Sequence, residues 1–229
     1  RELFNRKKEL FEGLDLTIVT PSRWLADTAR QSHFRDYPIH VIYNGIDLDI
    51  FKPNSGGFRN KNGLEEKFIL LGISFEWDKR KGIDVFVELA KRLPDAYQIV
   101  LVGTDQKAEE LLPDNIIAIR RTQNQQELAE IYTAADLFVN PTREEVLGLV
   151  NIEALACGTP GVTFKSGGSP ECYDQTCGSV VDCDDIDALE KEIIRICEEK
   201  PYTKQACINK AKEFDKNERF KEYLELYER

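Results

Sequence analysis

The chain has 229 residues, of which 41% are hydrophobic and 31% are charged, and this is enough for one large domain with a well-filled core. The formal net charge of −10 at pH 7 would repel a phosphate backbone, so we expect no nucleic-acid partner. The sequence shows neither a secretory leader nor an apolar run of the ~18 residues that a membrane span needs, and we therefore expect a soluble, cytoplasmic protein.

Six cysteines all lie in the second half of the chain, and none belongs to the C-x-x-C pairs that are typical of zinc sites. We expect reduced thiols that pack as small apolar groups, and no metal site. These residues are Cys157, Cys172, Cys177, Cys183, Cys197 and Cys207.

Short apolar runs alternate with amphipathic segments along most of the chain. The predicted strands comprise residues 16–19, 40–43, 68–74, 98–103, 115–119, 136–140, 160–164 and 178–182. The predicted helices comprise residues 22–32, 81–93, 125–135, 150–157, 184–200, 203–214 and 216–229. Continuous apolar strands between amphipathic helices are typical of a parallel sheet covered on both faces, so we predict a doubly wound, Rossmann-like α/β fold.

Residues 44–63 interrupt this alternation with Asn-Gly, Lys-Pro, Gly-Gly and Asn-Gly pairs, which mark turns. We interpret this segment as a hinge or linker between residues 1–43 and a main domain at residues 64–215, which a C-terminal helix at residues 216–229 follows. A piece of two or three elements cannot bury its own apolar surface, and the chain does not begin with methionine. We therefore expect residues 1–43 to be the remnant of an upstream domain.

The most informative stretch is PTREEVLGLVNIEALACGTPG, residues 141–161, which follows a predicted strand. Glu145 falls in its loop, and Glu153 falls about one turn into the next helix. At the start of that helix the amides of Gly148, Leu149 and Val150 lack intrahelical acceptors, which makes an anion site suited to phosphate. Each carboxylate offers acceptors only, which match the hydroxyl donors of a ribose or of a second polyol. A nucleoside diphosphate sugar satisfies all of these features.

Lys79, Arg80 and Lys81 concentrate positive charge at the start of a predicted helix in an otherwise acidic chain. Cations at a helix N-terminus are unfavourable for the helix dipole. An anionic ligand gives these side chains a reason to be there.

The stretch EEVLGLVNIEALACGTPGV resembles the signature of glycosyltransferase family 4, whose members are retaining enzymes of the two-domain GT-B fold. NGIDLDIFKP is similar to the interdomain hinge of that family, and RKGIDVF is similar to its phosphate-binding Lys-Gly element. The resemblance extends from about residue 16 to the last helix, with the motifs in the expected order. It implies that the chain is the C-terminal, donor-binding half of such an enzyme.

The resemblance also implies a role for each matching residue. Glu153 would hold the ribose hydroxyls, while Glu145 and Lys81 would be the catalytic pair, contacting the donor sugar and neutralising the diphosphate. The amides around Leu149 and Val150 would complete the phosphate cradle, and Arg80 would assist. The resemblance implies a nucleotide diphosphate sugar as the donor. Members of the family need no metal for transfer, so no cofactor is expected.

Two positions depart from the pattern of the family. Ile73 stands where the family often has an arginine after the glycine that Gly72 matches, so the phosphate contact would pass to Arg80 or Lys79. Val146 stands where the family often has glycine, and valine strongly disfavours positive φ.

Two further segments have more than one interpretation. SGGSPE, residues 166–171, either lines the donor pocket or is an ordinary loop with a capping serine. Residues 119–124 follow a predicted strand at the sheet edge where ligand loops are expected, which makes Arg120 and Arg121 candidates for nucleobase contacts.

We therefore expect the donor-binding domain of a retaining hexosyltransferase that acts on a glycan or on a lipid-linked, membrane-proximal acceptor. The acceptor site would lie in the upstream domain, so this chain would bind the donor and transfer nothing alone. Two alternatives stay open: a non-catalytic nucleotide-sugar-binding module, and a dinucleotide-binding oxidoreductase, although GISFEWDKRKG lacks the G-x-G-x-x-G spacing of the latter.

Overall fold

The computed structural model describes residues 2–54 and 56–228. Arg1, Ser55 and Arg229 belong to the predicted upstream, hinge and C-terminal segments and lie outside the described residues. The helices are α1 (Glu2–Phe11), α2 (Arg23–Arg30), α3 (Phe58–Asn62), α4 (Ile83–Arg92), α5 (Gln106–Glu109), α6 (Gln125–Ala134), α7 (Leu149–Ala156), α8 (Ile186–Glu199), α9 (Lys204–Ala211) and α10 (Lys216–Tyr227). The strands are β1 (Ile18–Thr20), β2 (Ile39–Val41), β3 (Phe68–Ile73), β4 (Tyr97–Val102), β5 (Ile116–Ile119), β6 (Leu137–Asn140), β7 (Gly161–Phe164) and β8 (Gly178–Val181). Two short 3-10 helices are η1 (Ser169–Cys172) and η2 (Lys212–Phe214).

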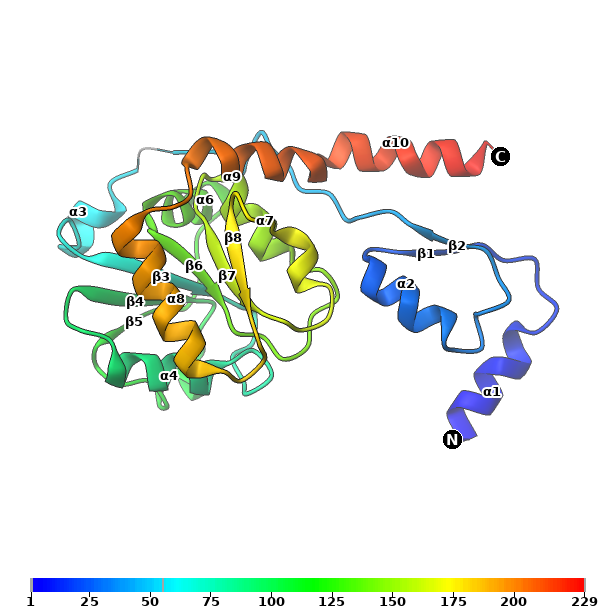
Figure 1. The fold of residues 1–229 in the computed structure, drawn as a ribbon, viewed down its shortest axis with the longest axis horizontal. Coiled ribbons are helices and arrows are strands. Elements are labelled where there is room, and N and C mark those ends of the chain that lie inside the picture. The colour runs from blue at the N-terminus through cyan, green and yellow to red at the C-terminus, as the bar shows by residue number, and fades with distance from the viewer. Residues whose placement is uncertain (1, 55, 229) are drawn as a thin grey trace.

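Six strands form one parallel sheet in the order β5-β4-β3-β6-β7-β8 (Figure 1). The chain builds outward from β3 through β4 to β5, then returns to place β6 against the other side of β3 and continues to β7 and β8. The order therefore reverses between β3 and β6, and the loops that leave the carboxyl ends of these two strands diverge. The predicted doubly wound α/β fold is confirmed.

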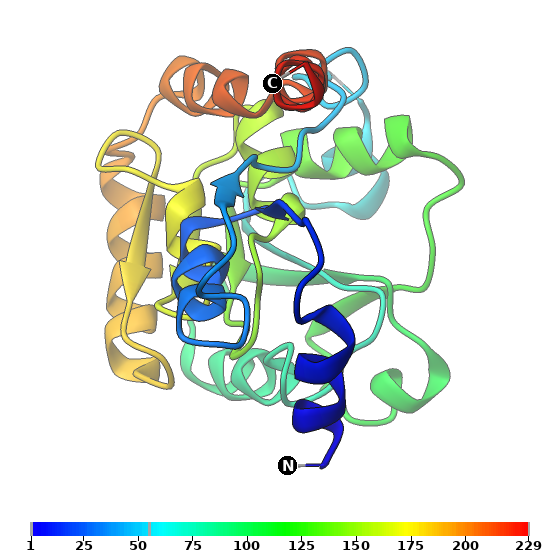
Figure 2. The ribbon, with the colours of Figure 1, turned by 90° about the vertical axis from the view of Figure 1, so that its right-hand side faces the viewer.

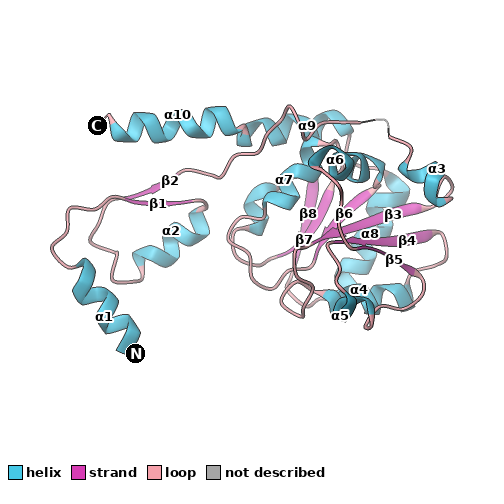
Figure 3. Cartoon of the chain, turned by 180° about the vertical axis from the view of Figure 1, so that it is seen from behind, coloured by secondary structure: helices cyan, strands magenta, loops and turns pink. Residues whose placement is uncertain are grey.

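The two faces of this sheet are covered by different helices (Figure 3). On β3, Ile69 and Leu71 pack with residues of α6, α7 and α9, whereas Leu70 packs with residues of α4 and α8. Side chains alternate along a strand, so an uninterrupted apolar run such as FILLGI buries both faces of the sheet. Gly72 is needed within this run, because a Cβ at that position would lie 2.6 Å from the ring of Phe86 on α4.

Residues 2–43 form a smaller unit, in which β1 and β2 pair in parallel and α2 packs against them. This unit lies beside the six-stranded domain, and α10 extends from the domain toward it (Figures 1 and 2). On α10 the side chains of Phe220, Leu224 and Tyr227, spaced three to four residues apart along the helix, are all exposed.

At the start of the predicted hinge, the chain is paired with the segment that leads into α10. Ile46 and Asp215 form a parallel bridge, the Ile46 N–H donates to the Phe214 carbonyl at 2.9 Å, and the Lys216 N–H donates to the Ile46 carbonyl at 3.0 Å. A Cβ at Gly45 would clash with the backbone of Lys216, so the two segments lie in direct contact. The segment that leaves the smaller unit and the segment that leads into α10 are therefore paired at one place.

The rest of the predicted hinge lies on the domain. Phe51 and Phe58 are buried in the core that α6 and α7 cover, and residues 58–62 form α3. The turn-forming pairs of the predicted hinge therefore connect short segments whose apolar residues are packed into the core of the domain.

Candidate functional site

A cavity of about 410 Å³ opens where the strand order reverses between β3 and β6. Its walls are the loop after β3 and the loop between β6 and α7, and the hinge contributes Asn44. The charged residues of the lining are Arg80, Lys81, Glu76 and Glu145. Ligands of open α/β sheets bind at such a crevice, because loops from neighbouring carboxyl ends separate there.

Helix α7 begins at the wall of this cavity. Gly148 is its N-cap residue, with φ of 85°, and no side chain caps the first turn. Leu149 and Val150 are the first helical residues and line the cavity, and the amides at such a helix start have no intrahelical acceptor. A Cβ at Gly148 would lie 2.7 Å from the Asn151 amide nitrogen, which together with the positive φ favours glycine. The predicted helix start is confirmed.

A buried polar network holds this helix start in place. Asn140 Nδ2 donates to Asn151 Oδ1 at 2.8 Å, and Asn151 Nδ2 donates to Ser169 Oγ at 2.9 Å. The hydroxyl oxygens of Thr163 and Ser169 lie 2.7 Å apart, and all four residues are buried. The network ties β6, α7, β7 and η1 together, and a satisfied buried network favours a single arrangement.

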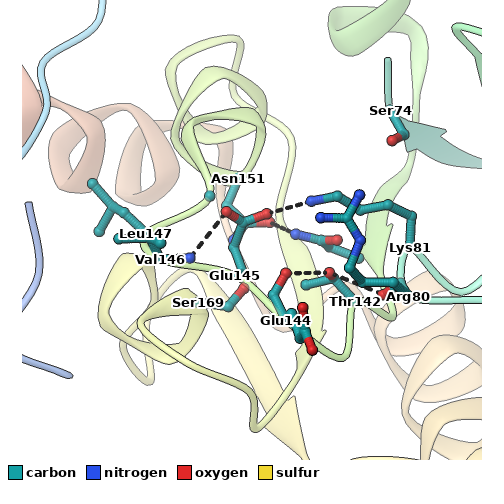
Figure 4. Close-up of polar contacts among 12 residues, drawn as sticks. Ser74, Arg80, Lys81, Thr142, Glu144, Glu145, Val146, Leu147, Asn151 and Ser169 are labelled. Atoms are coloured by element: carbon teal, nitrogen blue, oxygen red, sulfur yellow. Dashed lines mark hydrogen bonds and ion pairs between the residues drawn. The ribbon is translucent and has the colours of Figure 1, made fainter. Parts of the chain in front are cut away.

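Lys81 and Glu145 form an ion pair across the cavity (Figure 4), with Lys81 Nζ 2.8 Å from Glu145 Oε2. The other carboxylate oxygen of Glu145 accepts the Val146 N–H at 3.1 Å. Arg80 also lines the cavity, with Nε 3.6 Å from Asp78 Oδ2. Glu145 therefore provides the anion beside Lys81.

Arg143, which the sequence analysis does not single out, connects the two walls of the cavity. Its backbone N–H donates to the Arg80 carbonyl at 2.8 Å. Its guanidinium donates to both oxygens of Asp84, at 2.9 and 3.0 Å, and lies 2.7 Å from Asp184. Because Asp84 and Asp184 are 59 and 41 residues away in the chain, no local pattern reveals this role.

Glu153 lies one turn into α7, as predicted, but it is not among the residues that line the cavity. Its Oε2 accepts a hydrogen bond from the Tyr132 hydroxyl at 2.8 Å. Burial raises the pKa of Glu153, and the hydrogen bond from Tyr132 opposes that rise only in part. Tyr132 is itself fully buried, so Glu153 stands at the edge of the core, where the Tyr132 hydroxyl is its one side-chain donor among residues 2–54 and 56–228.

Arg121 lies exposed in the loop after β5, two strands away from β3, and it is not a lining residue of the cavity. Its neighbour Arg120 is engaged by both carboxylate oxygens of Glu109, at 2.9 and 2.7 Å. Lys79 lies outside the lining as well. The structure therefore gathers Arg80, Lys81 and Glu145 at one cavity and leaves Arg121 apart.

The two departures from the family pattern fall on the cavity wall, because Ile73 and Val146 both line it. Among the described non-glycine residues only Asp184 and Lys200 have positive φ. Val146 therefore adopts an ordinary backbone conformation, and its side chain does not strain the loop. Gly148, two residues on, supplies the left-handed turn instead.

The six cysteines are free, and all but Cys183 are buried. Burial raises the pKa of Cys172 to about 12, so this thiol stays protonated. Across residues 2–54 and 56–228, no three or more His, Cys, Asp or Glu side chains are grouped to hold a metal ion. In the same part of the chain, no helix has the length and apolar character needed to cross a membrane.

The sequence matches the family described as "Glycosyl transferases group 1" over residues 56–214. It is 32% identical over 162 residues to a D-inositol 3-phosphate glycosyltransferase of Mycobacterium sp. (strain JLS), a match that covers 65% of this chain and 37% of that protein. The chain therefore spans well under half the length of this curated relative.

Solved structures share the fold. The sucrose-phosphate synthase of Thermosynechococcus elongatus superposes with a TM-score of 0.86 at 25% identity, over 100% of this chain and 61% of that one. Anabaena Alr3699/HepE in complex with UDP-glucose superposes with a TM-score of 0.81 at 18% identity, over 98% of this chain and 67% of that one. The second likeness is one of fold, and both neighbours contain a further third or more of chain.

Proposed function

Since the chain belongs to the glycosyl transferases group 1 family, we propose that it binds a nucleoside diphosphate sugar and forms the donor-binding part of a retaining hexosyltransferase. One observation carries this proposal: Lys81, Arg80 and the start of α7 surround a single cavity at the reversal of the sheet. Two cations and a set of helix amides match a diphosphate, whose charge they would offset as it becomes the leaving group. Membership of this family sets aside the alternative of a dinucleotide-binding oxidoreductase.

Glu145 takes the donor sugar in this proposal. Its carboxylate presents acceptors to sugar hydroxyls beside the phosphate cradle, and it pairs with Lys81 at 2.8 Å. When the donor binds, Lys81 turns to the diphosphate and Glu145 turns to the sugar. The ion pair holds both side chains at the cavity where these new contacts form.

Glu153 takes the ribose hydroxyls. It lies one turn beyond the phosphate-binding amides of Leu149 and Val150 on α7, and its one protein donor, the Tyr132 hydroxyl, leaves acceptor capacity on the carboxylate. Arg121, in the loop after β5, is the candidate for the nucleobase, which would extend from the cavity toward β4 and β5.

The transfer itself proceeds with retention. The bond between the anomeric carbon and the phosphate oxygen breaks, the acceptor hydroxyl oxygen bonds to the same face of that carbon, and the hydroxyl proton passes to the departing phosphate. Lys81, Arg80 and the amides of Leu149 and Val150 stabilise the negative charge on that phosphate. We propose that these groups suffice, without a bound metal or an organic cofactor.

The acceptor site lies in a further domain that residues 2–43 and α10 contact. The exposed Phe220, Leu224 and Tyr227 of α10 offer an apolar surface for that domain, and the solved neighbours contain additional chain of a suitable length. The acceptor is a glycan or a lipid-linked precursor at the membrane, and the protein acts in the cytoplasm, where its six free thiols stay reduced. This chain alone binds the donor without transferring the sugar.

A thermal-stability panel tests the proposal. UDP, GDP, ADP, UDP-glucose and NAD are added separately to the chain, and we expect one nucleoside diphosphate and its sugar derivative to raise the melting temperature, because a ligand that binds only the folded form stabilises it. Stabilisation by NAD and by none of the nucleoside diphosphates would overturn the proposal. A protein that carries the further domain and binds the donor, but neither transfers nor hydrolyses the sugar, would instead be a nucleotide-sugar-binding module.

A further inference from the structure

Glu171, at the end of the SGGSPE segment, joins the six-stranded domain to the unit formed by residues 2–43. Its carboxylate accepts the backbone N–H groups of Arg23, at 2.9 Å, and of Trp24, at 2.8 Å. It also accepts the hydroxyl of Tyr43 at 2.8 Å. These partners lie 128 to 148 residues away in the chain, at the start of α2 and just after β2.

The contact completes the first turn of α2. Ser22 caps the helix by accepting the Leu25 N–H at 3.2 Å, and no acidic residue of α2 lies in its first turn. The amides of Arg23 and Trp24 therefore receive their acceptor from Glu171, which also places a negative charge at the positive end of the helix dipole. These two amides at the start of α2 thus take their acceptor from the other part of the chain.

The same segment is packed on the loop that carries Glu145. The Gly168 N–H donates to the Glu145 carbonyl at 3.0 Å. A Cβ at Gly167 would clash with that same carbonyl, and a Cβ at Gly168 would clash with the Val146 carbonyl and lie 2.9 Å from Ser22 Cβ. These glycines allow residues 167–171 to touch Glu145 on one side and α2 on the other.

Residues 167–172 are also bonded to the start of α7 and to the loop before it, so a shift of this segment would move part of the candidate site. Ser169 belongs to the buried network with Asn151 of α7, and Cys172 Sγ lies 3.0 Å from the Leu147 carbonyl that it contacts. A movement of η1 is therefore passed to the loop before α7, which holds Glu145. This interpretation differs from a donor-pocket role for SGGSPE, because residues 167–169 are not among the lining of the candidate cavity.

We propose that Glu171 is a positioning residue that couples the placement of residues 2–43 to the placement of Glu145. The proposal rests on the proposed function for its effect on the donor, since Glu145 is assigned to the sugar. When α2 is seated on Glu171, the Glu145 loop is held in its sugar-binding position. When the seat is lost, the loop relaxes and the phosphate cradle, built from Lys81 and α7, stays intact.

Hydrogen–deuterium exchange on the full chain tests the coupling without any ligand. In Glu171→Ala we expect exchange of the α2 start, residues 23–25, to rise about tenfold, the effect of losing a helix cap. We also expect exchange of residues 145–149 to rise. Glu171→Gln keeps an acceptor and should produce a smaller rise in both segments, which keeps the test valid if Glu171→Ala folds poorly.

Glu213→Gln is the matched control. Glu213 lines the same cavity of about 510 Å³ as Glu171, but it pairs with Lys210 rather than with α2. This variant should exchange like the unmodified chain at residues 23–25 and 145–149. A rise at the α2 start with no change at residues 145–149 would overturn the coupling and leave Glu171 as a helix cap alone.

Binding measurements then separate this proposal from the function on which it rests. We expect Glu171→Ala to weaken UDP-glucose binding roughly 2- to 30-fold, the range for residues that touch neither ligand nor effector, with UDP binding unchanged. Equal losses for UDP and UDP-glucose would contradict an effect through Glu145. If the unmodified chain bound no nucleoside diphosphate, the proposed function would fail while the exchange result would still decide the coupling.

Discussion

Two polar clusters occupy opposite ends of the same pair of strands, β3 and β6. At the amino ends, Arg59 donates to the carbonyls of Ala134, Leu64 and Lys67 at 2.9 to 3.2 Å and to Asp136 at 2.5 Å. Asp136 Oδ2 also accepts the Ile69 N–H at 2.8 Å. At the carboxyl ends, Lys81 and Glu145 share a single ion pair beside a cavity and beside the uncapped start of α7.

The two clusters differ in how many of their hydrogen-bond donors already have an acceptor in the protein. This difference separates the structural cluster at Arg59 from the binding cluster at Lys81. Arg59 donates four of the five N–H groups of its guanidinium to acceptors of the protein, so little donor capacity remains for a ligand. Lys81, Arg80 and the first amides of α7 keep donor capacity that points to a shared space. Hydrogen-bond accounting therefore distinguishes the two ends, although both hold a cation beside a carboxylate.

The largest expected effect is a loss of folding stability when the structural cluster at Arg59 is broken. Arg59→Met should destabilise the chain by about 3 kcal/mol, because it removes the cation beside the partly buried Asp136 and the hydrogen bonds that Arg59 donates to three carbonyls. Urea unfolding measures this loss, and nucleotide affinity should change little. Arg59→Lys restores the charge but not the fork of donors, so it should recover only part of the stability.

Removing the cation of the binding cluster should instead lower nucleotide affinity and leave folding stability nearly unchanged. Lys81→Met should weaken nucleoside diphosphate binding roughly 10- to 100-fold, the effect of losing a hydrogen bond to a charged group. Folding stability should change by less than about 1 kcal/mol, since single ion pairs near the surface contribute little. Isothermal titration calorimetry measures the affinity, and Lys79→Met, a neighbouring cation outside the cavity lining, should bind as the unmodified chain does.

The two glutamates sharpen the comparison within the binding cluster. Glu145→Gln should bind UDP at least as tightly as the unmodified chain, because Lys81 loses its competing partner, but should bind UDP-glucose less tightly. Glu153→Gln should weaken UDP and UDP-glucose alike, by about 1 to 3 kcal/mol. Calorimetry with both ligands checks the division, which is wrong if the two variants behave in the same way.

The smallest expected effect is the pH dependence of stability at Glu153. Burial raises the pKa of Glu153 in the folded state, so the protonated carboxyl is favoured by folding. That contribution is fully present below the unfolded pKa and is lost as pH rises through the folded pKa. In urea unfolding, the stability of Glu153→Gln relative to the unmodified chain should therefore increase as the pH rises from the ordinary glutamate pKa through the raised folded-state pKa. A relative increase as the pH falls would contradict the assignment.

The sequence predicts the parts of this molecule that local patterns determine. Runs such as FILLGI and QIVLVG place β3 and β4 to within a residue or two, and Gly148 marks the start of α7 because a glycine in left-handed conformation is needed there. The alternation of strands and helices predicts a doubly wound parallel sheet, but it does not give the position at which the strand order reverses. Short helices such as α3 and α5 escape the analysis, because they are one turn or so long and have no periodic apolar pattern.

Long-range polar contacts lie beyond a single sequence. Nothing near Arg143 indicates that it connects Asp84 to Asp184, and nothing near Glu171 indicates a helix start 148 residues earlier. Glu153 could be placed on α7 from its spacing, but its burial beside Tyr132 depends on the packing of α6 against α7. The motif residues of the candidate site were accessible from sequence, while the residues that hold them were not.

The bridge between Ile46 and Asp215 is the expected pivot for rotation between the two parts of the chain. Because two hydrogen-bonded segments lie side by side here, we expect any rotation of residues 2–43 relative to the six-stranded domain to centre on this bridge. Gly45 lies against Lys216 without room for a side chain, so we expect a larger residue at position 45 to disrupt this bridge.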